Sequence, residues 1–193
     1  MSEELTAAKA AARRTAYAAR KAAHADPGRR AAAARDAATR FLGAGLVSPG
    51  EIVAGYRPIR TEIDPTGLMQ ALAGRGHRLC VPVIEGEGLP LAFREWHPGC
   101  AMETGAFGAE IPAAGDWLEP TLLIAPLVAF DRGCWRLGYG GGFYDRTLAL
   151  LGSRRPTRAV GFAYAAQALD AVPREATDQR LHAVVTEREV IRP

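Results

Sequence analysis

Residues 136–146 have the sequence Arg136-Leu137-Gly138-Tyr139-Gly140-Gly141-Gly142-Phe143-Tyr144-Asp145-Arg146, with four glycines in the five positions 138–142. The apolar stretch 121–130 precedes this segment and is predicted to be a strand buried on both faces. The following segment, 143–151, is predicted to be a short helix stopped by Gly152. This order of strand, glycine-rich loop and helix predicts that the loop lies at the carboxyl end of a strand, where open α/β sheets bind ligands.

The glycine-rich loop is suited to holding phosphate. Glycine adopts positive φ and lets a ligand approach the backbone, and amide groups at a helix N-terminus attract anions. Neither well-known phosphate signature fits, because a Walker A loop needs Gly-Lys-Ser/Thr and a dinucleotide fingerprint needs a third glycine where Phe143 stands. We predict a phosphate or nucleotide site, with a purely structural tight turn as the alternative. Asp145, in the first helical turn, either stabilises the helix dipole or holds a divalent cation beside the phosphates.

The rest of the chain alternates between helical and strand-like patterns, which indicates a mainly parallel sheet flanked by helices. We therefore predict a three-layer α/β/α fold in a single domain, 1–193, with residues 1–45 forming an alanine-rich helical pair packed on it. The expected helices run from Ser2 toward His24, from the Asp26-Pro27 cap to near Gly43, and from Asp64-Pro65 to near Gly74. The expected strands are 51–56, 79–84, 89–93, 121–130, 159–164 and 183–186. Residues 96–117 are expected to be a loop that borders the site.

Composition narrows the class of protein. The chain has 193 residues, of which 48% are hydrophobic, enough for one well-buried domain, and it contains no internal repeat. Its three cysteines show no Cys-x-x-Cys spacing, which favours a reducing, cytoplasmic setting over a disulfide framework or zinc cluster. The chain begins without a basic and apolar leader, and no apolar stretch is long enough to span a bilayer. Secretion and membrane insertion are therefore not expected.

Basic residues concentrate at the N-terminal end of the chain. Residues 1–40 carry nine basic and four acidic side chains, and at about 100° per residue Lys9, Arg13, Arg20 and His24 share one stripe of the first predicted helix. Such a stripe either faces an anionic ligand or is simply solvated. Because 22 of the 24 basic residues are arginine, Lys9 is an unusual choice, and the compact charge of a lysine suits a phosphate oxygen.

The glycine-rich segment, together with Pro126-Leu-Val-Ala-Phe-Asp131, resembles the signature of the 5-formyltetrahydrofolate cyclo-ligase family. Lys9-Ala-Ala-Ala-Arg13 is similar to the family's Lys-x-x-Leu-Arg, and residues 172–178, Val-Pro-Arg-Glu-Ala-Thr-Asp, resemble its closing motif. The resemblance covers the whole chain, and its central block is the specific part. The chain departs from the family pattern at Ala12, where leucine is usual, and at residues 133–135, Gly-Cys-Trp, where an Arg-Gly-Tyr-like turn is usual.

The resemblance implies an enzyme that uses ATP and a divalent cation, Mg²⁺, to close 5-formyltetrahydrofolate into 5,10-methenyltetrahydrofolate, without a covalent protein intermediate. Glu62 stands where the family has a folate-contacting glutamate, and Trp96 could stack on the folate, although burial alone also explains a tryptophan. The implied roles are catalysis for Lys9 and Arg136; ATP binding for Lys9, Arg13, Arg136, Gly138, Tyr139, Gly140, Gly141, Gly142, Phe143 and Tyr144; folate binding for Glu62 and Trp96; and metal binding for Asp145 and Asp178.

Two other functions remain open at this point. An ATP-using relative could act on another formylated heterocycle, which would keep the phosphate loop and change the surroundings of Glu62 and Trp96. A non-catalytic paralogue could bind RNA through the basic N-terminal helices, but the chain has no recognisable RNA-binding signature. The expected partners are therefore ATP and a small folate, with neither nucleic acid nor membrane, and the expected state is a cytoplasmic monomer.

Overall fold

The computed structural model describes residues 2–193. A seven-stranded sheet with the strand order β11-β10-β9-β6-β1-β2-β3 forms its centre, and neighbours are parallel from β10 through β2. The edge strands β11 and β3 run antiparallel to their neighbours. The sheet strands are β1 (Ile52–Ala54), β2 (Arg78–Val83), β3 (Ala92–Trp96), β6 (Leu122–Ala125), β9 (Arg158–Phe162), β10 (Ala183–Val185) and β11 (Val190–Ile191).

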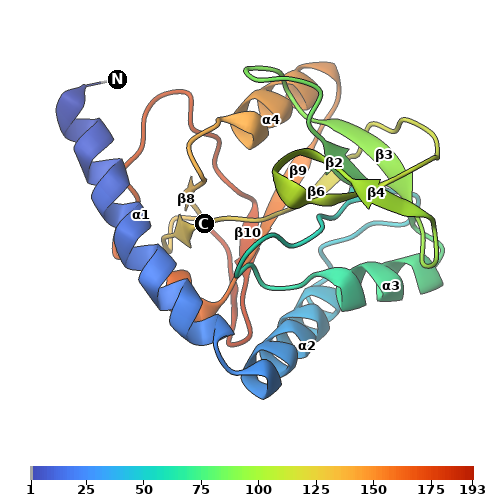
Figure 1. Ribbon diagram of the computed structural model, residues 1–193, viewed down its shortest axis with the longest axis horizontal. Helices are drawn as coiled ribbons and strands as arrows, with labels where there is room; N and C mark the ends of the chain where they lie inside the picture. Colours follow the sequence, from blue (N-terminus) through green and yellow to red (C-terminus); the bar gives the residue numbers. More distant parts are fainter. Residues whose placement is uncertain (1) are drawn as a thin grey trace.

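Helices cover both faces of the sheet (Figure 1). On one face, α2 (Pro27–Gly43) and α3 (Thr66–Gly74) pack through Phe41 and Met69 onto alternate strand residues. On the other face, α4 (Phe143–Arg154) packs through Leu148 and Leu151. Because parallel strands bury side chains on both faces, this arrangement gives two core layers. The predicted three-layer α/β/α fold with a mainly parallel sheet is therefore confirmed.

The N-terminal helix, α1 (Glu3–His24), has a different place from α2. Its buried Ala16 packs against Val128 and Leu137, outside the main sheet, and Figure 1 shows α1 along one side of the molecule. Ser2 caps α1 by accepting a hydrogen bond from the Leu5 amide at 3.2 Å. Asp26 caps α2 by accepting one from the Arg29 amide at 2.7 Å, with proline in the first turn. Both helix starts agree with the sequence prediction.

The prediction of one long strand over 121–130 is wrong. The stretch forms β6 and then β7 (Ala129–Phe130), which leaves the main sheet and pairs with β8 (Arg136–Leu137) in a separate two-stranded sheet. Pro126 directly follows β6, and a proline cannot donate a ladder hydrogen bond. The glycine-rich loop therefore follows the short strand β8, and not a strand of the main sheet.

Three further boundaries differ from the predictions. The helix α4 continues through Gly152 to Arg154, because one glycine inside a helix costs only about 1 kcal/mol. The predicted strand 89–93 lies three residues later, at β3. The stretch 96–117 is not wholly a loop, since it contains the antiparallel hairpin β4 (Met102–Thr104) and β5 (Glu110–Pro112) around the 3₁₀ turn η1 (Ala106–Gly108).

The last short element, η2 (Ala165–Gln167), follows β9 and lies beside α1. Among residues 2–193, no helix combines the length and the apolar composition that a membrane span requires.

Candidate active site

The glycine-rich loop joins β8 to α4 and has the backbone geometry that its glycines predict. Gly140 has a φ of 110° and Gly142 has a φ of 65°, in the region that side chains disfavour. Gly142 is the N-cap residue of α4 and supplies no side chain to cap it. The first-turn amides of α4 are therefore left for another acceptor, which is the arrangement that binds anions at helix N-termini.

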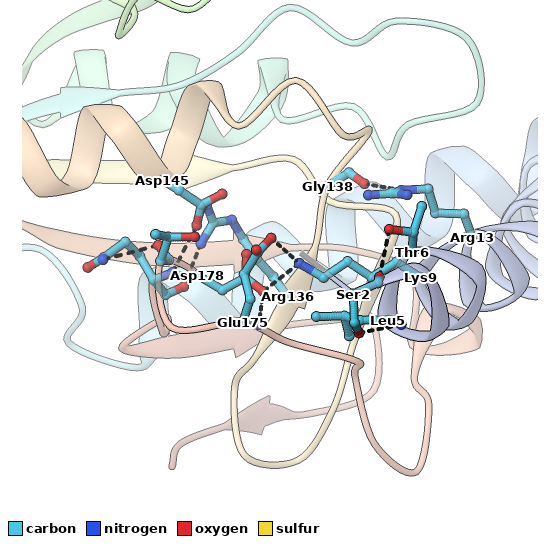
Figure 2. Close-up of polar contacts among 12 residues, drawn as sticks. Ser2, Leu5, Thr6, Lys9, Arg13, Arg136, Gly138, Asp145, Glu175 and Asp178 are labelled. Carbon is cyan, nitrogen blue, oxygen red and sulfur yellow. Dashed lines mark hydrogen bonds and ion pairs between the residues drawn. The ribbon is translucent and has the colours of Figure 1, made fainter.

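Two basic side chains of α1 reach the same region (Figure 2). The Lys9 ammonium donates to Glu175 Oε1 and to Asp178 Oδ2, each at 2.8 Å, and Lys9 is only 6% exposed. Arg13 Nε donates to the Gly138 carbonyl at 2.9 Å. Burial lowers the pKa of Lys9, but the hydrogen bonds that it donates to Asp178 and Glu175, together with the charges of these carboxylates, outweigh the effect of burial and leave the pKa raised. Lys9 is thus a buried, ion-paired cation, and the interpretation of its stripe as solvated is wrong at this position.

Arg136 forms a second ion pair, with Asp145, near that of Lys9 (Figure 2). Its guanidinium donates to Asp145 Oδ1 at 2.8 Å and to the Gln179 carbonyl at 2.6 Å. The Gln179 amide also donates to Asp145 Oδ1 at 2.8 Å. Because Gln179 follows Asp178 directly, these contacts bring the two predicted metal-binding carboxylates to one loop. Asp145 therefore has a partner that neither sequence interpretation named, namely Arg136.

In the part of the chain that the structure describes, Asp145 and Asp178 do not belong to a preformed metal site. Within residues 2–193, no group of three or more His, Cys, Asp or Glu side chains is placed to hold a metal ion. In that same range, Asp145 Oδ2 and Asp178 Oδ1 accept no protein hydrogen bond. Mg²⁺ usually binds through one or two carboxylates together with substrate phosphates and waters. The donor set therefore fits Mg²⁺ only if a phosphate ligand completes it.

Glu62 lies between β1 and α3 and is buried, with 5% of its surface exposed. Its Oε1 accepts a hydrogen bond from the Tyr139 hydroxyl at 2.6 Å, and its Oε2 accepts one from the Ile59 amide at 2.9 Å. Burial raises the pKa of Glu62, and the hydrogen bonds from Tyr139 and Ile59 oppose that rise only in part. Glu62 is therefore a buried carboxylate, and the glycine-rich loop contacts it directly through Tyr139.

A cavity of about 690 Å³ opens beside Glu62, between α2 and the loop that precedes α3. Three arginines line it, Arg30, Arg35 and Arg60, and within residues 2–193 none of them forms an ion pair with a carboxylate. His24 also lines the cavity, but burial and the charges of Arg30 and Arg20 lower its pKa. The cavity therefore carries positive charge from its arginines, one buried carboxylate at Glu62 and one exposed carboxylate at Asp64.

Trp96 is the one predicted site residue that the structure does not bring to this region. It is 6% exposed, lies on the edge strand β3 opposite Leu79, and belongs to the core cluster shared with α2 and α3. It does not line the cavity beside Glu62. Core packing therefore accounts for Trp96, and its contact with a ligand stays a prediction.

Three residues of the site were not among the site residues assigned from the sequence. Arg20, on the same stripe as Lys9 and Arg13, is 1% exposed and donates to the Tyr139 hydroxyl at 2.7 Å. Glu175 pairs with Lys9, and Gln179 contacts Arg136 and Asp145. The helical spacing of Arg20 was a usable signal, because it faces the same side as Lys9. Glu175 lies in the stretch 172–178 that resembles the family's closing motif, but the motif did not give it a partner. Nothing in the local sequence pointed to Gln179, because its partners are more than thirty residues away.

The fold and the site are those of an α/β protein with a glycine-rich loop at a helix N-terminus, beside a cavity that carries a buried carboxylate. The sequence model of the 5-formyltetrahydrofolate cyclo-ligase family matches residues 5–187. The chain is 35% identical to the 5-formyltetrahydrofolate cyclo-ligase of Escherichia coli K12 over 162 residues, covering 81% of this chain and 88% of that protein. It is 32% identical to the enzyme of that name from Mycolicibacterium smegmatis, covering 74% of this chain and 76% of that protein.

Solved structures agree with these sequence relatives. The NMR structure of 5,10-methenyltetrahydrofolate synthetase from Aquifex aeolicus superposes with a TM-score of 0.78 at 29% identity, covering 95% of this chain and 92% of that one. A synthetase from Mycoplasma pneumoniae, at 22% identity and a TM-score of 0.73 over 93% and 99% of the two chains, shares the fold. The chain belongs to the 5-formyltetrahydrofolate cyclo-ligase family, an enzyme family whose activity is the ATP-dependent cyclisation of 5-formyltetrahydrofolate.

Proposed function

We propose that this chain converts 5-formyltetrahydrofolate to 5,10-methenyltetrahydrofolate with ATP, and that the reaction takes place between the glycine-rich loop and Glu62. One observation carries this placement: the hydroxyl of Tyr139, a residue of the loop, donates to Glu62 at 2.6 Å. A phosphate held by the loop and a folate held at Glu62 would therefore be neighbours. That proximity is what direct transfer of a phosphoryl group to the folate requires.

The nucleotide side of the site is assigned to the loop and its basic neighbours. The amides of Gly138–Gly142 and of the first turn of α4 are the donors for the phosphates. Lys9, Arg13 and Arg136 supply positive charge, which matters most where charge shifts during phosphoryl transfer. Lys9 and Arg136 are paired with carboxylates in the structure, so ATP binding exchanges some of these ion pairs for contacts with phosphate oxygens.

Asp145 and Asp178 are the residues that would hold Mg²⁺. When bound there, the cation neutralises phosphate charge during transfer. The two aspartate carboxylates would lose their ion pairs with Arg136 and Lys9, because these two basic side chains would then contact the phosphates. Each of these four side chains would then have a partner of opposite charge in both the free and the loaded protein.

The folate side is assigned to Glu62 and the cavity next to it. A buried carboxylate is a strong acceptor for the paired N–H groups of a pterin ring. The arginines that line the cavity, Arg30, Arg35 and Arg60, complement the carboxylates of the glutamate part of the substrate. This cavity distinguishes a folate from a formylated heterocycle without an acidic tail, and it supports the folate as the substrate.

The chemistry needs no protein nucleophile. The formyl oxygen attacks the γ-phosphorus, and ADP departs with the electrons of the broken P–O bond. The formyl carbon, now activated by phosphate, is attacked by the anilino nitrogen, which loses its proton. Departure of phosphate completes the methenyl bridge. The protein contributes by orienting the two substrates and by neutralising charge.

All the residues proposed for the site belong to one chain, which supports a monomer as the working form. Cys80, Cys100 and Cys134 are free thiols, which supports a reducing, cytoplasmic setting. The alternative of RNA binding through the basic stripe of α1 is not favoured, because Lys9 and Arg20 are buried against the rest of the protein.

The direct test is to follow methenyl absorbance in the ultraviolet after mixing the protein with 5-formyltetrahydrofolate and MgATP. We expect absorbance to rise only when both substrates and Mg²⁺ are present. A flat trace from folded protein would exclude the proposed function.

Asp145→Asn tests the metal part of the proposal. If Asp145 holds Mg²⁺, turnover should fall by orders of magnitude and the Mg²⁺ dependence of the rate should shift, because the cation at the phosphates is lost or displaced. Asp36→Asn, an exposed position on α2, is the matched control. If Asp145 acts only through Arg136 and the helix terminus, the variant should melt at a lower temperature but keep the wild-type response to Mg²⁺.

A further inference from the structure

Arg20 is a buried cation without a buried counter-ion in direct contact. It is 1% exposed, and among residues 2–193 it forms no ion pair with a carboxylate. Its hydrogen bonds are to neutral groups: Nε donates to the Thr61 hydroxyl at 3.1 Å, and Nη1 donates to the Tyr139 hydroxyl at 2.7 Å and to the Leu127 carbonyl at 3.4 Å. Burying a charge is costly unless hydrogen bonds and nearby charge compensate it, so this position calls for an explanation.

The compensation comes through Tyr139. Its hydroxyl accepts from Arg20 and donates to Glu62 at 2.6 Å, so one oxygen joins the cation to the carboxylate. The guanidinium also lies over the rings of Tyr17 and Tyr139, 5.4 Å from each centroid. Hydrogen bonds in such a chain polarise and strengthen one another. Arg20, Tyr139 and Glu62 therefore form one connected unit.

This unit joins three parts of the molecule that are distant in sequence. Arg20 is on α1, Tyr139 is in the glycine-rich loop, and Glu62 is in the loop between β1 and α3. Arg20 also donates to the Thr61 hydroxyl, next to Glu62, so that it holds both loops at once. The Tyr139 hydroxyl is hydrogen-bonded to Arg20 and Glu62. In the proposed function the loop therefore binds phosphate through its backbone amides.

We propose that Arg20 is a positioning residue that ties the glycine-rich loop to Glu62 through the Tyr139 hydroxyl, so that nucleotide and folate reinforce each other's binding. The inference rests on the proposed function and adds a coupling between its two sites. A nucleotide that orders the loop also fixes Tyr139, and Tyr139 then holds Glu62 in place for the folate. By thermodynamic linkage, folate must increase the affinity for nucleotide by the same factor.

The experiment measures the Kd of 5-formyltetrahydrofolate by calorimetry, with and without a saturating ATP analogue that has a methylene group between its β- and γ-phosphorus atoms. We expect about a tenfold tighter Kd with the analogue in the wild type, within the usual range for such couplings. Tyr139→Phe keeps the ring and the backbone but removes the bridging hydroxyl, so the ratio should fall to about one. Arg20→Lys should also lower this ratio of Kd values. The double variant should lower it little further than Tyr139→Phe alone, because both substitutions break the same hydrogen-bonded unit.

Tyr17→Phe is the matched control. Its ring lies beside Tyr139, with centroids 6.0 Å apart, but within residues 2–193 its hydroxyl makes no hydrogen bond to Arg20, Tyr139 or Glu62. It should keep the wild-type coupling, and melting curves identify any variant that has not folded. If Tyr139→Phe kept the wild-type ratio of Kd values, the inference would be overturned. The proposed function would still stand if the wild-type protein turned over its substrates. A wild type without turnover would overturn the function and this inference with it.

Discussion

At the scale of single residues, the structure changes what a substitution at Lys9 should do. On an exposed helix face, Lys9→Ala would leave stability intact. Lys9 is instead 6% exposed and contacts Glu175 and Asp178, so removing it leaves two partly buried carboxylates without their cation. We expect Lys9→Ala to cost about 1–3 kcal/mol of unfolding free energy and to raise the KM for ATP. The other lysine, Lys21, is exposed, and Lys21→Ala should change neither quantity.

Urea denaturation of the two lysine variants, with the ATP dependence of turnover, decides the point. Unchanged stability in Lys9→Ala would contradict the ion-pair role that the structure gives to this residue. Unchanged KM and turnover would contradict its proposed contact with phosphate.

The second prediction at this scale concerns the pH dependence of folate binding at Glu62, because burial raises the pKa of this carboxyl from its ordinary value of 4.5. Protonation then occurs at a higher pH than for an exposed glutamate, and the protonated form loses its charged acceptor. Affinity for folate should therefore be highest above the raised pKa and decline as the pH falls through it. Glu62→Gln should weaken folate binding by roughly 1.5–3 kcal/mol and should abolish this acid decline.

Calorimetric titration with folate between pH 5 and pH 8 provides the measurement, and Glu87→Gln, at an exposed position, is the control. If Glu62→Gln lost folate affinity at low pH as the wild type does, that loss would have to come from another titrating group.

At the scale of elements, the glycine that caps α4 and the glycine inside it should respond to substitution in opposite directions. Gly142 has a φ of 65°, and a Cβ there would lie 2.6 Å from Arg146 Nη1. Gly142→Ala should therefore lower the unfolding free energy by about 1–2 kcal/mol, the cost of a left-handed side chain. Gly152 lies inside the helix, and a Cβ there meets no atom within 4 Å, so Gly152→Ala should raise it by about 0.4–1 kcal/mol.

Melting curves of both glycine variants test this pair. Stabilisation by Gly142→Ala would mean that the loop tolerates a side chain where the structure has a left-handed cap.

The element scale also explains which sequence predictions held. The starts of α1 and α2 are set by Ser2 and Asp26 within one helical turn, so local chemistry was sufficient to predict them. The segment 121–130 was predicted as one strand because apolar periodicity cannot tell a continuous strand from two short ones divided at Pro126. The pairing of β7 with β8 depends on a hairpin that propensity does not reveal.

At the scale of the whole molecule, the site depends on elements far apart in the chain. The helix α1 supplies Lys9, Arg13 and Arg20, which contact residues more than forty positions away. Ligands that bridge such elements should stabilise the native state as a unit. At a concentration of one hundred times its Kd, MgATP should add about 2.7 kcal/mol, which corresponds to a rise in Tm of roughly 5–11 °C for a chain of this size.

Calorimetric melting with MgATP, and with MgAMP as the control, measures this effect. We expect the full shift only with the triphosphate, since the proposed contacts are with its phosphates. Equal shifts with both nucleotides would contradict the assignment of the glycine-rich loop to the terminal phosphates.

The sequence by itself determined the class of fold, the glycine-rich loop and most of the charged residues of the site. These properties depend on local hydrophobic periodicity, on helix caps that form within one turn, and on a cluster of glycines at the start of a helix, which is typical of anion binding. The tertiary structure decided the partners: the two carboxylates that hold Lys9, the pairing of Asp145 with Arg136, the burial of Trp96 in the core, and the unit formed by Arg20, Tyr139 and Glu62. Hydrogen bonds and burial between distant segments arise only when the chain packs, so no local pattern contains them.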